Sequence, residues 1–287
     1  MTNTVAAKVD PSPAKVLYYR HRLPIRIVHW TNVLCLSILL ASGLGIFNAH
    51  PALYWGQSSY STRPAILEIT SQDTPGGLRG VVRVAGHELD TTGVLGVSRR
   101  ADGTQNRHAF PSWLTIPSGY SLADSRLWHF FFAWLLLFNG LFYVAYSILG
   151  GHLRRDMLPD RADLKGIGAS IRDHLRFRHP TGDAARRYNV LQKLAYLVVI
   201  FILLPLIILM GMAMSPMLDA VMTGWVDLFG GRQSARTIHF IIAWLLVGFV
   251  LIHVFEVIVS GLFNHLRSMV TGYYAVDANA AKKGPVP

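Results

Sequence analysis

Cysteine is nearly absent from this sequence of 287 residues, in which Cys35 stands alone inside an apolar run. A single thiol excludes an internal disulfide, a cysteine-bound iron–sulfur cluster and the C-x-x-C-H attachment of a c-type haem. Any metal centre in the chain must therefore rely on histidine, of which there are 12.

Charged residues are also scarce, at 15% of the chain against 52% hydrophobic residues, which is too apolar for an ordinary soluble domain of this size. Acidic residues are the rarer kind, with 16 Asp and Glu against 27 Lys and Arg. The basic residues flank apolar runs and form no polar module, so the charge indicates membrane topology and not nucleic-acid binding.

Long apolar runs are what the sequence does contain. A helix needs about 20 apolar residues to cross the hydrocarbon core of a bilayer. Four segments meet this length, and Pro205 is expected to kink the third. We therefore expect an all-α membrane protein, a bundle of four transmembrane helices within residues 27–270, with spans at about 27–47, 127–149, 190–214 and 238–263.

The loops predict the orientation of these helices. Residues 150–189 hold nine Lys or Arg against five Asp, and the N-terminal segment 1–26 is also basic. By the positive-inside rule both lie on the cytoplasmic side of the membrane, as does the tail 271–287. We expect this membrane to be the inner membrane of a bacterium. The insertion 48–124 is then periplasmic, and its β-leaning runs and turn signals predict a cap of short strands. The first 24 residues lack the apolar core of a signal peptide, so no cleavage is expected.

Histidines inside the spans are the strongest functional signal, because an ionisable side chain is costly there. His239 and His253 lie fourteen residues apart, just under four helical turns, so they project from nearly the same face at two depths. Given the predicted orientation, His29 reaches the depth of His253, and His129 reaches the depth of His239. These pairs predict two b-type haems with bis-histidine ligation, since zinc or copper would need further ligands.

Two further patterns accompany the histidines. The motif R-x-x-H occurs at three helix entries, and an arginine one turn from a haem ligand can donate to the haem propionates. Glycines eleven and fourteen residues after a histidine fall near its face, at the depth expected for the other haem. These patterns add five candidate cofactor contacts: Arg26, Arg126, Arg236, Gly43 and Gly140.

At this point the chain resembles the four-helix dihaem cytochrome b subunits, most closely the thiosulfate reductase cytochrome b type, which are related to the b-type subunits of nickel–iron hydrogenase and formate dehydrogenase. The resemblance rests on YRHRLPIRIVHWTN from Tyr19, SGLGIFNAHPALYWG from Ser42, RLWHF from Arg126, and GGRQSARTIHF followed by His253. It covers most of residues 17–270. The long first outer loop departs from the hydrogenase and formate dehydrogenase relatives.

The resemblance implies a subunit that passes electrons between the quinone pool and a periplasmic oxidoreductase, for which we favour a molybdopterin enzyme. Quinone would react near the cytoplasmic haem, and donors expected there are His21, Arg22, Asn32, Asn139, His152 and Glu256. A stand-alone cytochrome b561 is an alternative electron carrier. A transporter with a histidine-lined path is an alternative of another class, although only apolar residues separate the two depths.

Overall fold

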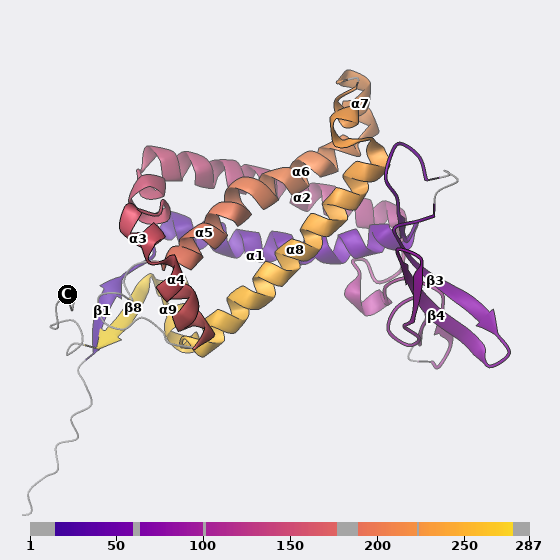
Figure 1. Cartoon of the computed structure of the whole chain (residues 1–287), viewed down its shortest axis with the longest axis horizontal. Coiled ribbons are helices and arrows are strands. Elements are labelled where there is room, and N and C mark those ends of the chain that lie inside the picture. The colour runs from indigo at the N-terminus through magenta and orange to yellow at the C-terminus, as the bar shows by residue number, and fades with distance from the viewer. Residues whose placement is uncertain (1–14, 60–63, 100–101, 177–188, 223, 278–287) are drawn as a thin grey trace, which may run out of the picture. The chain divides into compact units, whose positions relative to one another are not determined.

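The computed structural model describes residues 15–59, 64–99, 102–176, 189–222 and 224–277. The chain divides into two compact units, and Figure 1 labels the helices and strands. Unit 1 comprises residues 1–27, 146–196 and 252–287, and unit 2 comprises residues 28–145 and 197–251. Long helices run from one unit into the other, so each unit holds parts of several helices.

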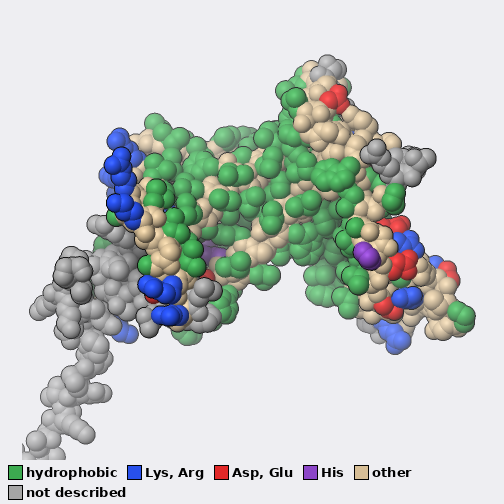
Figure 2. Space-filling view, in the orientation of Figure 1, with side chains coloured by type: hydrophobic (Ala, Val, Ile, Leu, Met, Phe, Trp, Pro, Cys, Tyr) green, Lys and Arg blue, Asp and Glu red, His purple; other side chains and the backbone are tan. Residues whose placement is uncertain are grey.

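Four helical stretches are long and apolar enough to cross a membrane, and this prediction is confirmed. They are α1 (Leu23–Asn48), α2 (Leu122–Leu149), the composite of α5 (Val190–Val198), η4 (Val199–Leu203) and α6 (Leu204–Ala213), and α8 (Arg232–Val259). Figure 2 shows hydrophobic side chains covering much of the visible helical surface, as expected for helices that face lipid.

Local chemistry moves the helix ends away from the predicted positions. α1 begins four residues before Ile27, with Pro24 in its first turn, where a missing N–H is not needed. α2 begins five residues before Leu127, because the Ser121 hydroxyl accepts the Asp124 N–H at 3.2 Å and caps the helix. The π-helical turn η4 ends two residues before Pro205, and the kink predicted there stays a prediction.

The fourth helix is shorter at its far end than the predicted limit of Phe263. α8 stops at Val259, because Gly261 adopts φ 115°, a conformation that other residues rarely accept. A separate helix, α9 (Leu262–Thr271), follows directly.

Unit 2 contains the packed core of the helices. One cluster joins Cys35 of α1 to Phe132 and Leu136 of α2, with Leu204 of α6 packed against it. A second cluster joins α6 and α8 through Met210, which is fully buried, and its neighbours on both helices. Helix α7 (Pro216–Val221) and the 3₁₀ turn η5 (Trp225–Phe229) connect α6 to α8.

The long insertion of unit 2 carries an antiparallel sheet in the order β2–β3–β4–β5. Its strands are β2 (Ala52–Leu53), β3 (Leu67–Thr74), β4 (Gly77–Val84) and β5 (His87–Asp90). The rest of the insertion contains a separate two-stranded pair, β6 (Ser98–Arg99) and β7 (Gln105–Asn106), and the 3₁₀ turn η1 (Ser112–Leu114). Phe47 of α1 packs with Ile69, Val82 and Phe110, so the sheet is anchored on the end of α1.

Unit 1 is built around a pairing of the two ends of the described chain. β1 (Lys15–Tyr19) and β8 (Tyr273–Asp277) form an antiparallel ribbon, so part of the predicted tail 271–287 is ordered. Asn264 of α9 holds β8 by exchanging two hydrogen bonds of 2.9 Å with Ala275. The connecting segment contains η2 (Leu153–Met157), α3 (Arg161–Lys165) and α4 (Ile167–Leu175), and Lys193 of α5 pairs with Asp163 at 2.7 Å.

Candidate functional site

Two of the predicted histidines face each other inside unit 2. His129 projects from α2 and His239 from α8, and their ring centroids lie 6.2 Å apart, with the ring planes inclined by 59°. Helices far apart in the sequence therefore bring these two imidazoles together, as the predicted pairing requires.

Hydrogen bonds fix the protonation of both rings. The His239 Nδ1 lies 2.9 Å from the Ile207 carbonyl oxygen, which only accepts, so Nδ1 carries the proton. The His129 Nδ1 lies 3.1 Å from the Ser42 hydroxyl, which itself donates to the Ile38 carbonyl at 2.7 Å and must accept from the ring. In each neutral ring Nε2 is then left with a lone pair, the form that binds a metal.

Two glycines make room for the rings. A Cβ added at Gly43 would lie 3.4 Å from Cε1 of His129, and one at Gly211 would lie 3.5 Å from Cε1 of His239. Each imidazole therefore packs against a helix surface with no side chain. Gly43 lies beside His129, at the depth that the sequence predicts. The His129 imidazole, however, occupies the space beside Gly43 that we expected the haem macrocycle to need. Around Gly140, an added Cβ would meet no atom within 4 Å.

The separation of the rings fits a metal ion held between them. Two metal–imidazole bonds of about 2 Å each, with about 1 Å from each ring centre to its nitrogen, give roughly 6 Å between centres. No cluster of three or more His, Cys, Asp or Glu suited to a metal ion occurs in the described residues. The pair thus suits a metal whose remaining ligands come from a macrocycle.

The other predicted pair falls in different units. His29 lies on α1 in unit 2, where its ring meets the edge of Trp30 with centroids 5.3 Å apart. His253 lies on α8 in unit 1 and is half-buried. The pairing of His29 with His253 stays a prediction.

Comparison with known proteins identifies the family. Residues 20–272 match the model of a family described as prokaryotic cytochrome b561. The chain belongs to the prokaryotic cytochrome b561 family. Membership confirms the resemblance to cytochrome b membrane subunits and implies haem b as the cofactor. With four apolar helices, this cytochrome b561 is a multi-pass membrane electron carrier.

One named protein is similar to about half of the chain. The chain is 35% identical, over 143 residues, to the putative protein-methionine-sulfoxide reductase subunit YedZ1 of Azospira oryzae. The match covers 48% of this cytochrome b561 and 67% of the relative.

The three arginines of the R-x-x-H motifs contact groups of the protein itself. Arg26 donates to the Val270 carbonyl of α9, within unit 1. Arg126 is exposed and lies over the Phe130 ring, 5.5 Å from its centroid. Arg236 donates to the His50 carbonyl and lies 5.6 Å from the centroid of Phe47. Guanidinium groups have five N–H donors, so these contacts are compatible with the predicted propionate bonds, which stay predictions.

His50 lies outside the spans, and its backbone carbonyl accepts from Arg236. Removal from water lowers the pKa of His50 below its ordinary value, and the charge of Arg236 lowers it further, against a smaller opposing effect of Glu68. Burial and the charge of Arg236 therefore both favour the neutral form of His50.

Among the quinone candidates, the structure joins two. The Asn139 side-chain amide donates to Asn32 Oδ1 at 2.7 Å and to the Val28 carbonyl at 3.1 Å, which ties α2 to α1 one turn from His29. His21 is buried in unit 1, where its backbone N–H donates to the Gly272 carbonyl at 3.2 Å, and Arg22 is exposed. His152 and Glu256 also lie in unit 1 and are half-buried.

Three groups around the histidines were not found from the sequence. Ser42 and Gly211 are ordinary residues of apolar helices, and the Ile207 carbonyl leaves no mark in a sequence at all. The adjacent residues Ser42 and Gly43 both contact the Nδ1–Cε1 edge of the His129 ring, and the sequence signal for them was a serine next to a glycine within a span.

Proposed function

We propose that this cytochrome b561 is a dihaem membrane subunit that carries electrons between the quinone pool and a periplasmic oxidoreductase. The observation that carries the proposal is the His129–His239 pair, whose spacing and bare Nε2 atoms suit one bis-histidine haem. A bound haem supplies reversible uptake of one electron. The protein supplies the two axial ligands, their orientation and an apolar surrounding that excludes water.

The second haem is proposed on His29 and His253. His239 and His253 share the single helix α8 without a break between them, so nearly four turns separate the two ligands on one face. This spacing supports the proposal of two redox centres, one nearer each membrane surface. We propose that quinone reacts near the second haem, with donors among His21, Arg22, Asn32, Asn139, His152 and Glu256.

The partner is proposed to bind on the side that carries the sheet of unit 2. This insertion is folded and presents exposed aromatic groups, including Trp113, which is 77% exposed, and Trp55 at 50%. The relative YedZ1 is named as a subunit of a putative protein-methionine-sulfoxide reductase. By this likeness the partner is the catalytic subunit of a reductase, and a molybdopterin enzyme remains our proposal. We place the sheet in the periplasm and both termini in the cytoplasm.

Two variants and one control test the haem assignment. Spectra of the purified full chain, reduced minus oxidised, are expected to show b-type α bands from two haems. His239→Ala should remove the haem shared with His129, and His253→Ala should remove only the other. His87→Ala, at an exposed site in β5, should change neither. The absence of any b-type α band, or the loss of the same haem in both variants, would refute the dihaem arrangement.

The family description also favours a second candidate, a stand-alone cytochrome b561 that exchanges electrons with a diffusible donor. Copurification decides between the two. A periplasmic protein that remains bound to the wild type, and is released when the exposed Trp113 is changed to Ser, supports the subunit. A chain that reduces or oxidises small donors while binding no protein supports the stand-alone carrier.

A further inference from the structure

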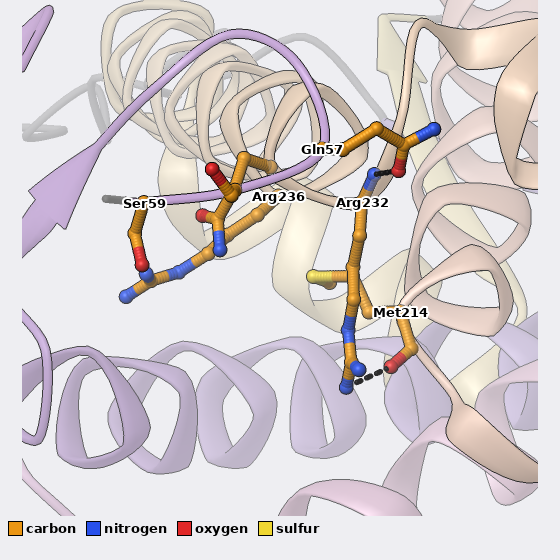
Figure 3. Close-up of a pocket in the computed structure, with 7 residues that line it drawn as sticks. Gln57, Ser59, Met214, Arg232 and Arg236 are labelled. Atoms are coloured by element: carbon orange, nitrogen blue, oxygen red, sulfur yellow. Dashed lines mark hydrogen bonds between the residues drawn. The ribbon is translucent and has the colours of Figure 1, made fainter. Parts of the chain in front are cut away.

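A cavity of about 450 Å³ lies in unit 2 where two of the membrane-length helices end (Figure 3). Gln57 and Ser59 line it from the loop after β2, Met214 from the end of α6, and Arg232, Gln233 and Arg236 from the first turns of α8. Because α6 ends at Ala213 and α8 begins at Arg232, the cavity lies at a surface of the membrane.

Hydrogen bonds hold the wall of the cavity in place. The Gly56 N–H donates to the Ser234 hydroxyl at 2.8 Å, and the Gln233 N–H donates to the Gly56 carbonyl at 2.9 Å. Gly231 permits this approach, since its φ is 102° and an added Cβ would lie 2.8 Å from the Gly56 oxygen. The loop is therefore fastened to the start of α8, and the cavity is a built feature of the fold.

The cavity is strongly cationic. Figure 3 shows the Arg232 side chain turned toward Met214, whose carbonyl accepts from Nη2 at 2.8 Å, and Arg236 extending toward Ser59. No carboxylate lines the cavity, and within the described part of the chain neither arginine pairs with one. Each guanidinium keeps further N–H donors, so the cavity suits a ligand with anionic oxygens.

The lining also contains an acceptor. The Gln233 Oε1 atom is buried and has no hydrogen-bond partner in the described residues. Because Gln233 lines the cavity, a turn of its side-chain amide would present this unpaired oxygen to a ligand. A ligand that carries both an anionic oxygen and a hydrogen-bond donor would then complement the cavity better than an anion alone. Phospholipid headgroups with a hydroxyl or ammonium group meet both needs.

We propose that this cavity binds the headgroup of a membrane phospholipid, with Arg232 and Arg236 supplying the positive charge that attracts the phosphate and Gln233 turning to accept from the hydroxyl or ammonium group. The phosphate of phosphatidylglycerol or phosphatidylethanolamine comes with such a donor, whereas the choline of phosphatidylcholine has none. A carboxylate of the cofactor shares the anionic chemistry but, when ionised, brings no donor for Gln233.

Native mass spectrometry of the full chain, with each of the three lipids added in turn, tests the proposal. The wild type should retain phosphatidylglycerol and phosphatidylethanolamine better than phosphatidylcholine. Arg232→Gln should weaken retention of phosphatidylglycerol about fivefold, the effect of one basic group at a membrane surface. Gln233→Met should abolish the preference over phosphatidylcholine. Arg232→Lys keeps the charge and should bind more lipid than Arg232→Gln.

Arg79→Gln is the matched control, because Arg79 lies in the same unit, on the sheet, and pairs with Asp90 outside the cavity. Equal retention of the three lipids by the wild type, or unchanged retention by Arg232→Gln, would overturn the proposal. A variant that keeps its lipid but loses haem would assign the cavity to the cofactor carboxylate and also overturn it. The lipid measurement needs no haem, so failure of the dihaem function would not affect it.

Discussion

Replacing Ser42 by alanine should weaken one haem and leave the other intact. Ser42 is fully buried, and its hydroxyl accepts the Nδ1 proton of His129 at 3.1 Å. Without that oxygen the ring keeps a buried N–H with no acceptor from this side chain, at a cost of about 1–3 kcal/mol. The ring keeps its hydrogen bond with the backbone of Leu39, so the change weakens, and does not remove, the restraint on its orientation and on the position of its proton. Counted in full against haem binding, this cost sets an upper limit of roughly 5- to 150-fold on the loss of haem affinity.

The assay is a redox titration of the purified chain, followed by haem release to a competing haem-binding protein. Loss of the acceptor makes His129 a weaker electron donor, so the midpoint potential of its haem should rise as haem release becomes faster. Ser37→Ala is the matched control. The Ser37 hydroxyl also donates to a backbone carbonyl within α1, that of Val33 at 2.8 Å, and Ser37 has no role in orienting His129. Ser42→Thr should restore the wild-type values. Equal behaviour of Ser42→Ala and Ser37→Ala would refute the assigned role.

Three further outcomes are expected. Gly211→Ala should be tolerated, because its Cβ would make an ordinary contact of 3.5 Å with the His239 ring, whereas Gly211→Val should displace the ring and remove that haem from the absorption spectrum. Asn139→Leu should lower the stability of the chain in detergent by about 1 kcal/mol through loss of an interhelical bond, and an unchanged unfolding midpoint would contradict it. Hydrogen bonds from Thr92, and then from Arg79, lower the pKa of Asp90 to about 2. Since this pKa is depressed, ionised Asp90 stabilises the sheet above about pH 4, and the contribution is lost as the pH falls toward 2. Amide exchange of β4 and β5, corrected for the intrinsic rate, should show this loss, and Thr92→Val should shift it to higher pH.

Hydropathy was sufficient to predict the four spans, because apolar length is the property that the membrane itself selects. It did not predict where the helices end. The run from Ile258 to Phe263 remains mainly apolar through Gly261, so only the backbone conformation of that glycine separates α8 from α9. The ribbon of β1 and β8 was missed because five-residue strands gain their hydrogen bonds from a partner more than 250 residues away.

The site residues that could be predicted are those whose side chains are energetically costly inside a membrane. His129 and His239 stood out because imidazoles in an apolar helix are expensive without a function. Ser42 opens one of the motifs quoted for the resemblance but was given no role, since a serine in a helix can bond to its own backbone, as Ser37 does. The Ile207 carbonyl belongs to the backbone, so only the three-dimensional arrangement shows that it orients a ligand.

The ribbon that joins Lys15–Tyr19 to Tyr273–Asp277 restricts how many times the chain can cross the membrane. Strands hydrogen-bonded to each other must share one side of the bilayer, so the chain between them crosses it an even number of times. Four crossings satisfy this parity, and three or five are impossible while the ribbon is intact. A reporter protein fused before β1 and another fused after β8 should therefore read the same compartment.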